Sequence, residues 1–154
     1  MNYWLMKTEP DAFGIADLKK RRQQTEHWDG VRNYQARNFM RAMQPGDQAF
    51  FYHSSCAEPG IAGIVEIACA AYPDFTAFDP KDPHYDPKSF AAKPVWYMVD
   101  VKLARAFKQP VTLARIKATP ALKNMRLVQR GNRLSIMPVT AKEWQTILQL
   151  EKKS

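Results

Sequence analysis

The order of apolar segments along the chain constrains its fold most. Runs with the aromatic and β-branched composition of strands occupy residues 3–6, 49–53, 61–70, 95–103 and 134–139. Helices are inserted between some of these runs, but they do not alternate with them as in a doubly wound fold, and no glycine-rich phosphate loop is present. This order predicts one α/β (α+β) domain over residues 1–154. Its mixed or antiparallel sheet of about five or six strands is expected to curl into a small open barrel flanked by helices.

Helix signals are local and clear. Asn33 can cap a helix that runs to about residue 43, with an apolar stripe at Ala36, Phe39, Met40 and Met43. Shorter helices are predicted around Ile15 and Leu18 and over residues 112–117 and 120–123. The sequence Thr140–Glu143 forms a capping box before a last helix whose apolar face carries Trp144, Ile147 and Leu148. Pro10 is expected to end the first strand, and Gly60 and Gly63 indicate a bend or a close backbone approach.

Residues 72–94 form a long loop with an unusual composition. Five of the eleven prolines and four aspartates lie in it. A loop of this length inside a compact domain is usually functional or disordered. Its five aromatic residues, which include Phe75 and Tyr85, argue against disorder.

The charge distribution points to a polyanion partner. The net charge is +8, and no acidic residue occurs between Asp100 and Glu143, a stretch that carries ten Lys and Arg residues. These ten charges exceed the whole net charge, so the excess is one-sided. A one-sided basic segment is typical of nucleic-acid binding, whereas a merely solvated face is the plainer explanation.

Other classes find little support in the residues. No apolar run is long enough to cross a bilayer and no signal peptide is evident, so we expect a cytoplasmic protein, or a nuclear one in a eukaryote, with no membrane partner. Cys56 and Cys69 are expected to be free thiols. The histidines His27, His53 and His84 show no metal-binding spacing, so no metal and no cofactor are predicted.

An enzyme remains an alternative. His53 and Ser54 place a base beside a nucleophile, and the aspartates of residues 74–86 are candidate cation ligands. Neighbouring residues of a strand point to opposite faces, however, so His53 and Ser54 need not touch. Asp-Pro pairs also mark turns more often than metal sites.

A binding site is better supported. Single bases are recognised by stacking on aromatic rings and by hydrogen bonds to the base edge. Trp28 follows His27 and precedes an Asp-Gly turn, and Asn33 and Tyr34 lie at the mouth of the predicted helix. Phe75 and Tyr85 of the long loop are further candidates. The remaining large aromatic residues are expected in the core: Trp4, Phe39, Phe50, Trp96 and Trp144.

Several segments together resemble the EVE domain family. They are YWLMKTEP, WDGVRNYQARNFMR, PGDQAFFYHS, GIAGIVEI, AYPDFTAFDP, YDPKS, WYMVDV, PVTLARIK and RLSIMPVT, in the order of the family. The resemblance implies a PUA-like barrel related to YTH domains, which hold a methylated base in an aromatic cage. It also implies a reader of a modified base, chiefly modified cytosine in DNA, that is not an enzyme.

The resemblance also assigns residues. Trp28 matches the tryptophan that forms one wall of the cage, and the segments with Lys7, Glu9, His53 and Ser54 match the border of the pocket. The opposite wall is expected from residues 72–90, with Phe75 or Tyr85 as candidates. Asn33, Tyr34, Ser54, Glu9 and His53 are expected to help bind the base, which enters after flipping out of the duplex. Backbone contacts are expected from Arg32, Arg37, Arg115, Lys117, Arg126, Arg130 and Arg133; Arg32 and Arg37 are alternatively expected to pair with Asp29.

The residues leave the ligand open. 5-Methylcytosine or 5-hydroxymethylcytosine in DNA is the main prediction, and a modified ribonucleotide in RNA is the alternative. A small nucleotide-acting enzyme that uses His53 and a protein-interaction module are the other readings. Phosphate-driven binding should weaken steeply with salt, whereas protein-partner binding should not.

Overall fold

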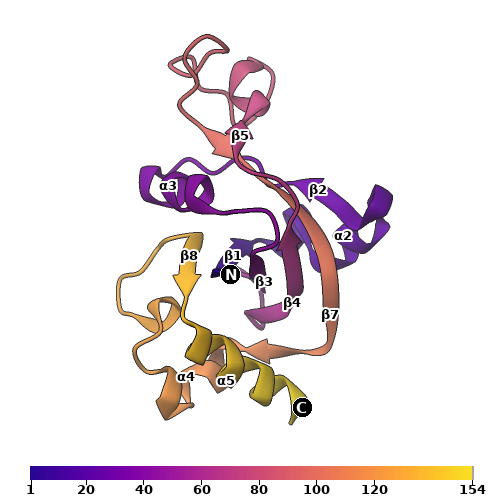
Figure 1. Ribbon diagram of the computed structural model, residues 1–154, viewed down its shortest axis with the longest axis vertical. Helices are drawn as coiled ribbons and strands as arrows, with labels where there is room; N and C mark the ends of the chain where they lie inside the picture. Colours follow the sequence, from indigo (N-terminus) through magenta and orange to yellow (C-terminus); the bar gives the residue numbers. More distant parts are fainter. Residues whose placement is uncertain (154) are drawn as a thin grey trace.

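A computed structural model describes residues 1–153 of the chain, and its centre is a curled six-stranded sheet (Figure 1). The strands are β1 (Tyr3–Thr8), β2 (Thr25–His27), β3 (Gln48–His53), β4 (Gly60–Ile67), β7 (Asp100–Thr112) and β8 (Ile136–Val139). They are ordered β2-β7-β4-β3-β1-β8, with β1 and β3 parallel and the other neighbours antiparallel. The predicted mixed α+β class, with a small open barrel and flanking helices, is confirmed.

Both faces of the central strands are buried, which explains their continuous apolar composition. Along β1 and β3, alternate residues enter two separate core clusters. Trp4, Met6 and Phe51 lie in one cluster with α3 (Tyr34–Ala42) against the sheet. Leu5 and Phe50 lie in the other, which is covered by α4 (Leu113–Lys117) and α5 (Ala141–Lys152). Trp144 of α5 stacks on Phe50 with 3.8 Å between ring centroids.

Two strands differ from the sequence prediction. The strand expected over residues 95–103 is instead the two-residue β6 (Tyr97–Met98) followed by β7, which continues to Thr112. The second half of β7 contains polar residues and Pro110, so its composition does not indicate a strand. This half pairs with β4 through register shifts, and proline is tolerated at such irregular places. The short β2 pairs with the start of β7 and has no apolar run of its own.

The predicted close backbone approach at β4 is confirmed. A Cβ atom on Gly63 would lie 2.6 Å from the carbonyl oxygen of Arg105 in β7, and one on Gly60 would lie 2.6 Å from that of Val111. Glycine therefore allows the two strands to cross closely where the sheet curls.

The helices begin where their caps predict. The Asn33 side chain accepts a hydrogen bond from the Ala36 N–H, and Thr140 and Glu143 form the expected reciprocal capping box before α5. Pro10 starts a short α1 (Pro10–Phe13) directly after β1, and α2 (Ile15–Lys20) follows it. The single-turn 3-10 helices η1 (Arg22–Gln24), η3 (Pro120–Leu122) and η4 (Arg126–Val128) lie outside the sheet.

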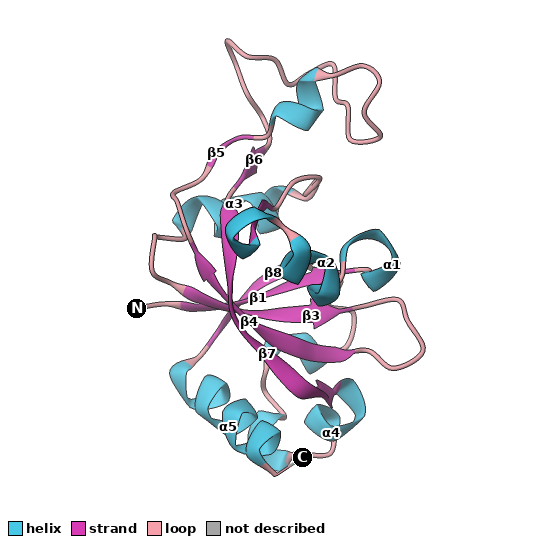
Figure 2. Ribbon diagram, turned by 90° about the vertical axis from the view of Figure 1, so that its right-hand side faces the viewer, coloured by secondary structure: helices cyan, strands magenta, loops and turns pink. Residues whose placement is uncertain are grey.

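The long loop forms an ordered arm, defined here as residues 74–96. Its stem pairs β5 (Tyr72–Pro73) with β6, and η2 (Phe75–Phe78) opens it. The arm projects from the barrel in both ribbon views (Figures 1 and 2). Asp79, Asp82 and Asp86 each accept a hydrogen bond from the backbone N–H two residues later, so these aspartates build turns. The Trp96 indole N–H donates to Asp86 over 2.7 Å and closes the arm on itself.

None of the helices within residues 1–153 combines the length and the apolar character that spanning a bilayer requires. Cys56 and Cys69 are both free thiols, as predicted. The aromatic residues predicted for the core are buried or half-buried.

Candidate base-binding pocket

A cavity of about 510 Å³ lies where the end of β1, α1 and β2 meet the arm. One wall is the segment 27–32, the polar half of the stretch that precedes α3. The other lining residues come from five places: Lys7, Thr8 and Glu9 at the end of β1, Ala12, Phe13 and Arg21 around α1 and η1, Glu26 of β2, His84 of the arm, and Ser135 before β8.

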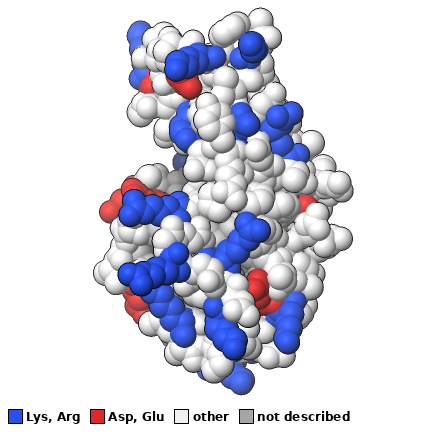
Figure 3. All heavy atoms as spheres, turned by 90° about the vertical axis from the view of Figure 1, so that its left-hand side faces the viewer, with Lys and Arg blue, Asp and Glu red and all other residues white. Residues whose placement is uncertain are grey.

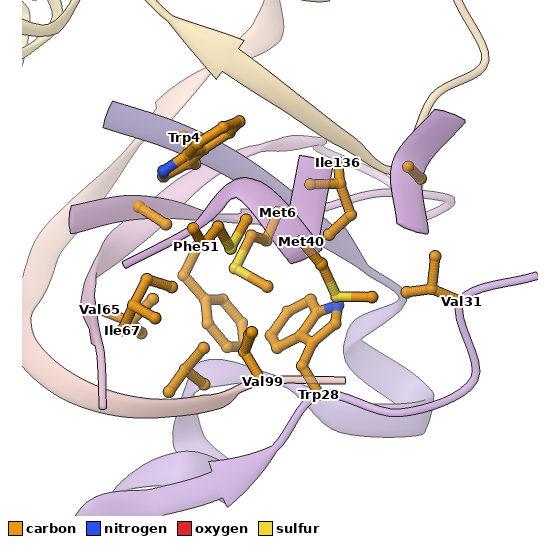
Figure 4. Close-up of a cluster of buried hydrophobic side chains, with 14 of the residues drawn as sticks. Trp4, Met6, Trp28, Val31, Met40, Phe51, Val65, Ile67, Val99 and Ile136 are labelled. Atoms are coloured by element: carbon orange, nitrogen blue, oxygen red, sulfur yellow. The ribbon is translucent and has the colours of Figure 1, made fainter. Parts of the chain in front are cut away.

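Trp28 forms the apolar back of the cavity rather than an exposed plate. It is 7% exposed, and its ring meets those of Phe13 and Phe51 edge to face. Its backbone N–H donates to the Val99 carbonyl, which fixes the segment against the sheet. Figure 4 shows the indole pointing inward toward Phe51 and Met40. Trp28 therefore lines the cavity, but most of its ring is used in packing.

The rim of the cavity holds a chain of contacts between ionisable side chains. Glu26 lies 2.6 Å from the Arg21 Nε and 2.9 Å from the His27 Nδ1, and the His27 Nε2 lies 3.3 Å from Asp29. Burial alone would raise the pKa of Glu26. The hydrogen bonds from Arg21 and the His27 N–H, together with the charges of both side chains, hold that pKa below its ordinary value.

Arg32 fastens the arm to the cavity wall. Its guanidinium donates to Asp74 over 3.0 Å, to the Thr76 hydroxyl over 3.2 Å and to the His84 carbonyl over 2.7 Å. Asp74 is fully buried and also accepts from the Gly30 N–H. Burial would raise the pKa of Asp74, but the hydrogen bonds from Thr76, Gly30 and Arg32 lower it. The predicted alternative partner of Arg32, Asp29, is wrong, because the guanidinium is directed at Asp74.

Gly30 lets His84 approach the wall. Gly30 has φ +78°, and a Cβ atom there would lie 2.6 Å from the His84 imidazole. Only glycine offers both the left-handed backbone and the space. His84 is thus the arm residue whose ring lies directly over the Trp28–Arg32 segment.

Lys7 and Glu9 are charged groups of the lining that have no ion-pair partner among the described residues. Burial lowers the pKa of Lys7, and its ammonium lies 5.8 Å from the centre of the Tyr52 ring. Within residues 1–153, neither side chain makes an ion pair. The cavity therefore contains an unpaired donor and an unpaired acceptor.

Six predicted pocket residues do not line the cavity. Asn33 caps α3, and Tyr34 is 62% exposed and stacks on Trp96. The His53 Nε2 accepts a hydrogen bond from the Ile15 N–H over 3.1 Å, and the Ser54 hydroxyl donates to the Thr8 carbonyl.

The two aromatic candidates of the arm also point elsewhere. Phe75 is exposed and its ring lies 5.1 Å from that of His27, outside the lining, and Tyr85 is exposed. His84, between them in the chain, takes the place expected for one of them. The sequence of the arm does not distinguish His84 from its neighbours as a cavity residue, because its position depends on contacts with Gly30 and Arg32 in another segment.

The basic residues divide between two ends of the molecule. Arg115 and Lys117 belong to α4, which follows the last residue of β7. The cavity lies at the other end of β7, where β2 pairs with its first residues. Arg126 lies beside α3, with its guanidinium 5.5 Å from the Phe39 ring. Arg130 and Arg133 are exposed in the segment that leads to Ser135 at the cavity. Arg37 donates to the Val95 carbonyl, not to Asp29. Lys and Arg spread over the face in Figure 3, with few acidic residues among them.

The chemistry of the site favours binding. Among residues 1–153 there is no cluster of three His, Cys, Asp or Glu residues arranged to hold a metal ion. Burial lowers the pKa of His53, and its Nε2 is occupied as an acceptor, so it is not poised beside Ser54 as a base.

Comparisons with known proteins show similarity over nearly the whole chain. Thymocyte nuclear protein 1 of Homo sapiens is 50% identical over 169 residues, which cover 99% of this chain and 75% of the relative. A solved structure of human THYN1 protein in complex with 5-methylcytosine containing DNA is 48% identical, with a TM-score of 0.95, and the match covers 100% of this chain and 99% of that one. A crystal structure from Pseudomonas putida is 51% identical with a TM-score of 0.93, covering 97% of this chain and 99% of that one.

A more distant likeness concerns the fold alone. An ASCH protein from Zymomonas mobilis has 9% identity and a TM-score of 0.55 over 97% of this chain and 99% of its own. The family model described as EVE domain, by contrast, matches residues 2–150, nearly the whole chain. The protein belongs to the EVE domain family.

Proposed function

We propose that this protein is a non-enzymatic reader of modified cytosine in DNA, which takes the flipped base into the cavity beside Trp28. The observation that carries the proposal is the relative with 48% identity and a TM-score of 0.95 whose structure is a complex with 5-methylcytosine containing DNA. The cavity adds a physical reason, because it combines an aromatic wall with unpaired polar groups.

The polar groups suit the edge of cytosine. Carboxylates accept hydrogen bonds from the exocyclic amino group of cytosine, and Glu9 is the unpaired carboxylate of the lining. Lys7 offers ammonium donors for the ring nitrogen and oxygen acceptors of the same edge. The His84 ring and the Trp28 wall then face the planes or the substituent of the base.

The energetics predict modest selectivity. Flipping a base costs a few kcal/mol, and stacking on an aromatic ring returns roughly 1–3 kcal/mol. The two nearly cancel, so hydrogen bonds to Lys7 and Glu9 must supply the net gain of placing the base in the cavity. A methyl group in a close-fitting slot adds about 1–3 kcal/mol, equivalent to a preference of about tenfold to a few hundredfold.

Fluorescence polarisation at fixed moderate salt tests the proposal. The probes are matched duplexes with cytosine, 5-methylcytosine or 5-hydroxymethylcytosine at one position, and RNA counterparts. Trp28→Ala is a poor variant, because Trp28 is 7% exposed and its truncation should cost roughly 3–5 kcal/mol of folding free energy. Glu9→Gln is better, since Glu9 is exposed and Gln replaces an acceptor oxygen by a donor.

Glu58→Gln is the matched control, because Glu58 is exposed in the loop after β3 and does not line the cavity. Glu9→Gln should weaken binding to the preferred duplex by about fivefold or more, and Glu58→Gln should not. Equal affinity of wild type for all DNA probes would contradict the reader. Tighter binding to the RNA counterparts would replace DNA by RNA as the ligand.

A further inference from the structure

Two arginine side chains, Arg41 of α3 and Arg126 beside it, pack on aromatic rings and have no polar partner in the described part of the chain. The Arg41 guanidinium lies 4.6 Å from the centre of the Tyr97 ring, and that of Arg126 lies 5.5 Å from the Phe39 ring. Both residues are exposed. Among residues 1–153, neither guanidinium has a carboxylate within salt-bridge distance or a hydrogen-bond acceptor, whereas Arg21, Arg32 and Arg105 each pair with a carboxylate.

This arrangement prepares an arginine for a phosphate. Stacking on an aromatic ring restricts the guanidinium while its N–H groups stay free, so less conformational entropy is lost when an anion binds. The planar N–H fork matches the oxygens of phosphate as well as those of carboxylate, and the net charge of +8 favours a polyanion such as DNA as the partner.

The segments of the chain that carry these arginines contain no acidic residue. No Asp or Glu occurs between Asp29 and Asp47, the part of the chain that contains α3. Arg126 belongs to the acid-free stretch between Asp100 and Glu143. Two acid-free segments therefore meet at α3, which lies on the side of the molecule turned to the viewer in Figure 3.

The region is connected to the cavity by a run of stacked side chains. The Arg32 guanidinium, in the cavity wall, lies 5.5 Å from the centre of the Trp96 ring. Tyr34 stacks on the same Trp96 at 5.0 Å, and Arg37 lies 4.9 Å from the Tyr34 ring. Arg41 follows Arg37 one helical turn later.

We propose that α3 is a second DNA-contact surface, on which Arg41 and Arg126, with Tyr34, bind the phosphates of the duplex that presents its base to the cavity. It rests on the proposed function for the ligand, but it assigns a different surface and a different contribution. Phosphate contacts position the duplex and carry no sequence information. The α3 surface should therefore strengthen binding to modified and unmodified DNA alike.

The test is a titration of unmodified and 5-methylcytosine duplexes at a series of salt concentrations, with Arg41→Gln and the control Lys152→Gln. Both substitutions remove one exposed positive charge, and Lys152 ends α5, which packs on the opposite face of the sheet from α3. Arg41→Gln should reduce the slope of log affinity against log salt by about 1, equally for both duplexes. Lys152→Gln should leave the slope unchanged, and Arg41→Lys should retain most of it.

The outcomes separate this proposal from the previous one. An unchanged slope in Arg41→Gln, or an equal loss in Lys152→Gln, would overturn the α3 surface even if wild type prefers modified DNA. A reduced slope without any preference for modified DNA would keep the α3 surface and refute the reader. Absence of DNA binding by wild type would refute both.

Discussion

The ion pair between Arg32 and Asp74, which holds the arm against the cavity wall, allows its contribution to the folding free energy to be predicted. Arg32 donates to Asp74, Thr76 and the His84 carbonyl, and Asp74 is fully buried. Arg32→Ala leaves the Asp74 carboxylate without its cation. Breaking a buried pair in this way costs about 3–5 kcal/mol. Asp74 keeps the donors of Gly30 and Thr76, so we expect the lower end, about 3 kcal/mol.

The reverse change, Asp74→Ala, should cost about 4 kcal/mol, because the N–H groups of Gly30 and Thr76 lose their acceptor as well. If the two side chains stabilise the fold through each other, the double variant should cost only about 5 kcal/mol. The coupling energy is then about 2 kcal/mol, within the range seen for contacting residues.

Urea unfolding of the four proteins measures this cycle, and thermal unfolding checks it. For a chain of this size, about 3 kcal/mol corresponds to a loss of about 6–12 °C in Tm for Arg32→Ala. Costs that add within about 0.5 kcal/mol would refute the coupling. The arm would then be held by its own turns and by the Trp96–Asp86 hydrogen bond instead.

Three further predictions concern backbone and protonation. Gly30→Ala should destabilise by roughly 1–2 kcal/mol and weaken base binding, because a Cβ at φ +78° displaces the His84 ring; urea unfolding and the polarisation assay measure the two effects. The pKa of Asp74 is lowered in the folded protein. The stabilisation that its charge gives the fold is therefore present above the unfolded pKa of about 4, and it is lost as the pH falls toward the lower folded value. Asp74→Asn should start from a lower folding free energy and lose less of it in acid, which urea unfolding at a series of pH values measures. Burial raises the pKa of Tyr52 to about 12, so its stabilisation is present below pH 10 and lost as the pH rises. Burial and Asp100 raise the pKa of Tyr72 as well, so tyrosine absorbance titration should show a late component that Tyr52→Phe reduces but does not abolish.

Local signals in the sequence were sufficient for most of the fold. The cap at Asn33 and the capping box at Thr140 depend only on neighbours in the chain, and both form as predicted. The second half of β7 was missed because its partner residues in β4 lie about 45 positions earlier, and pairing, not composition, makes it a strand. The same holds for β2, whose residues Thr25–His27 become a strand only against β7.

The residues of the site are harder to predict from the sequence than the helices and strands, because they come from separate segments of the chain. Trp28, Lys7 and Glu9 were placed by resemblance, and all three line the cavity. His53 was expected there too, but its ring nitrogen is occupied by the backbone of α2. His84 could not be chosen in advance from the arm, because its place depends on the missing Cβ of Gly30 in another segment.

The polar residues around Trp28 serve mainly to build the site. His27 is engaged by Glu26 and Asp29, Gly30 and Arg32 hold Asp74, and the ring of Trp28 is packed from behind. Groups already satisfied within the protein offer a ligand little new free energy, but they keep a cavity open at fixed shape before the ligand arrives. Discrimination must then come from the few unpaired groups and from the fit of the substituent, while bulk affinity comes from phosphate contacts outside the cavity. We therefore expect substitutions in the cavity to change the preference for modified bases. Substitutions at α3 should change the affinity for DNA and its salt dependence without changing that preference.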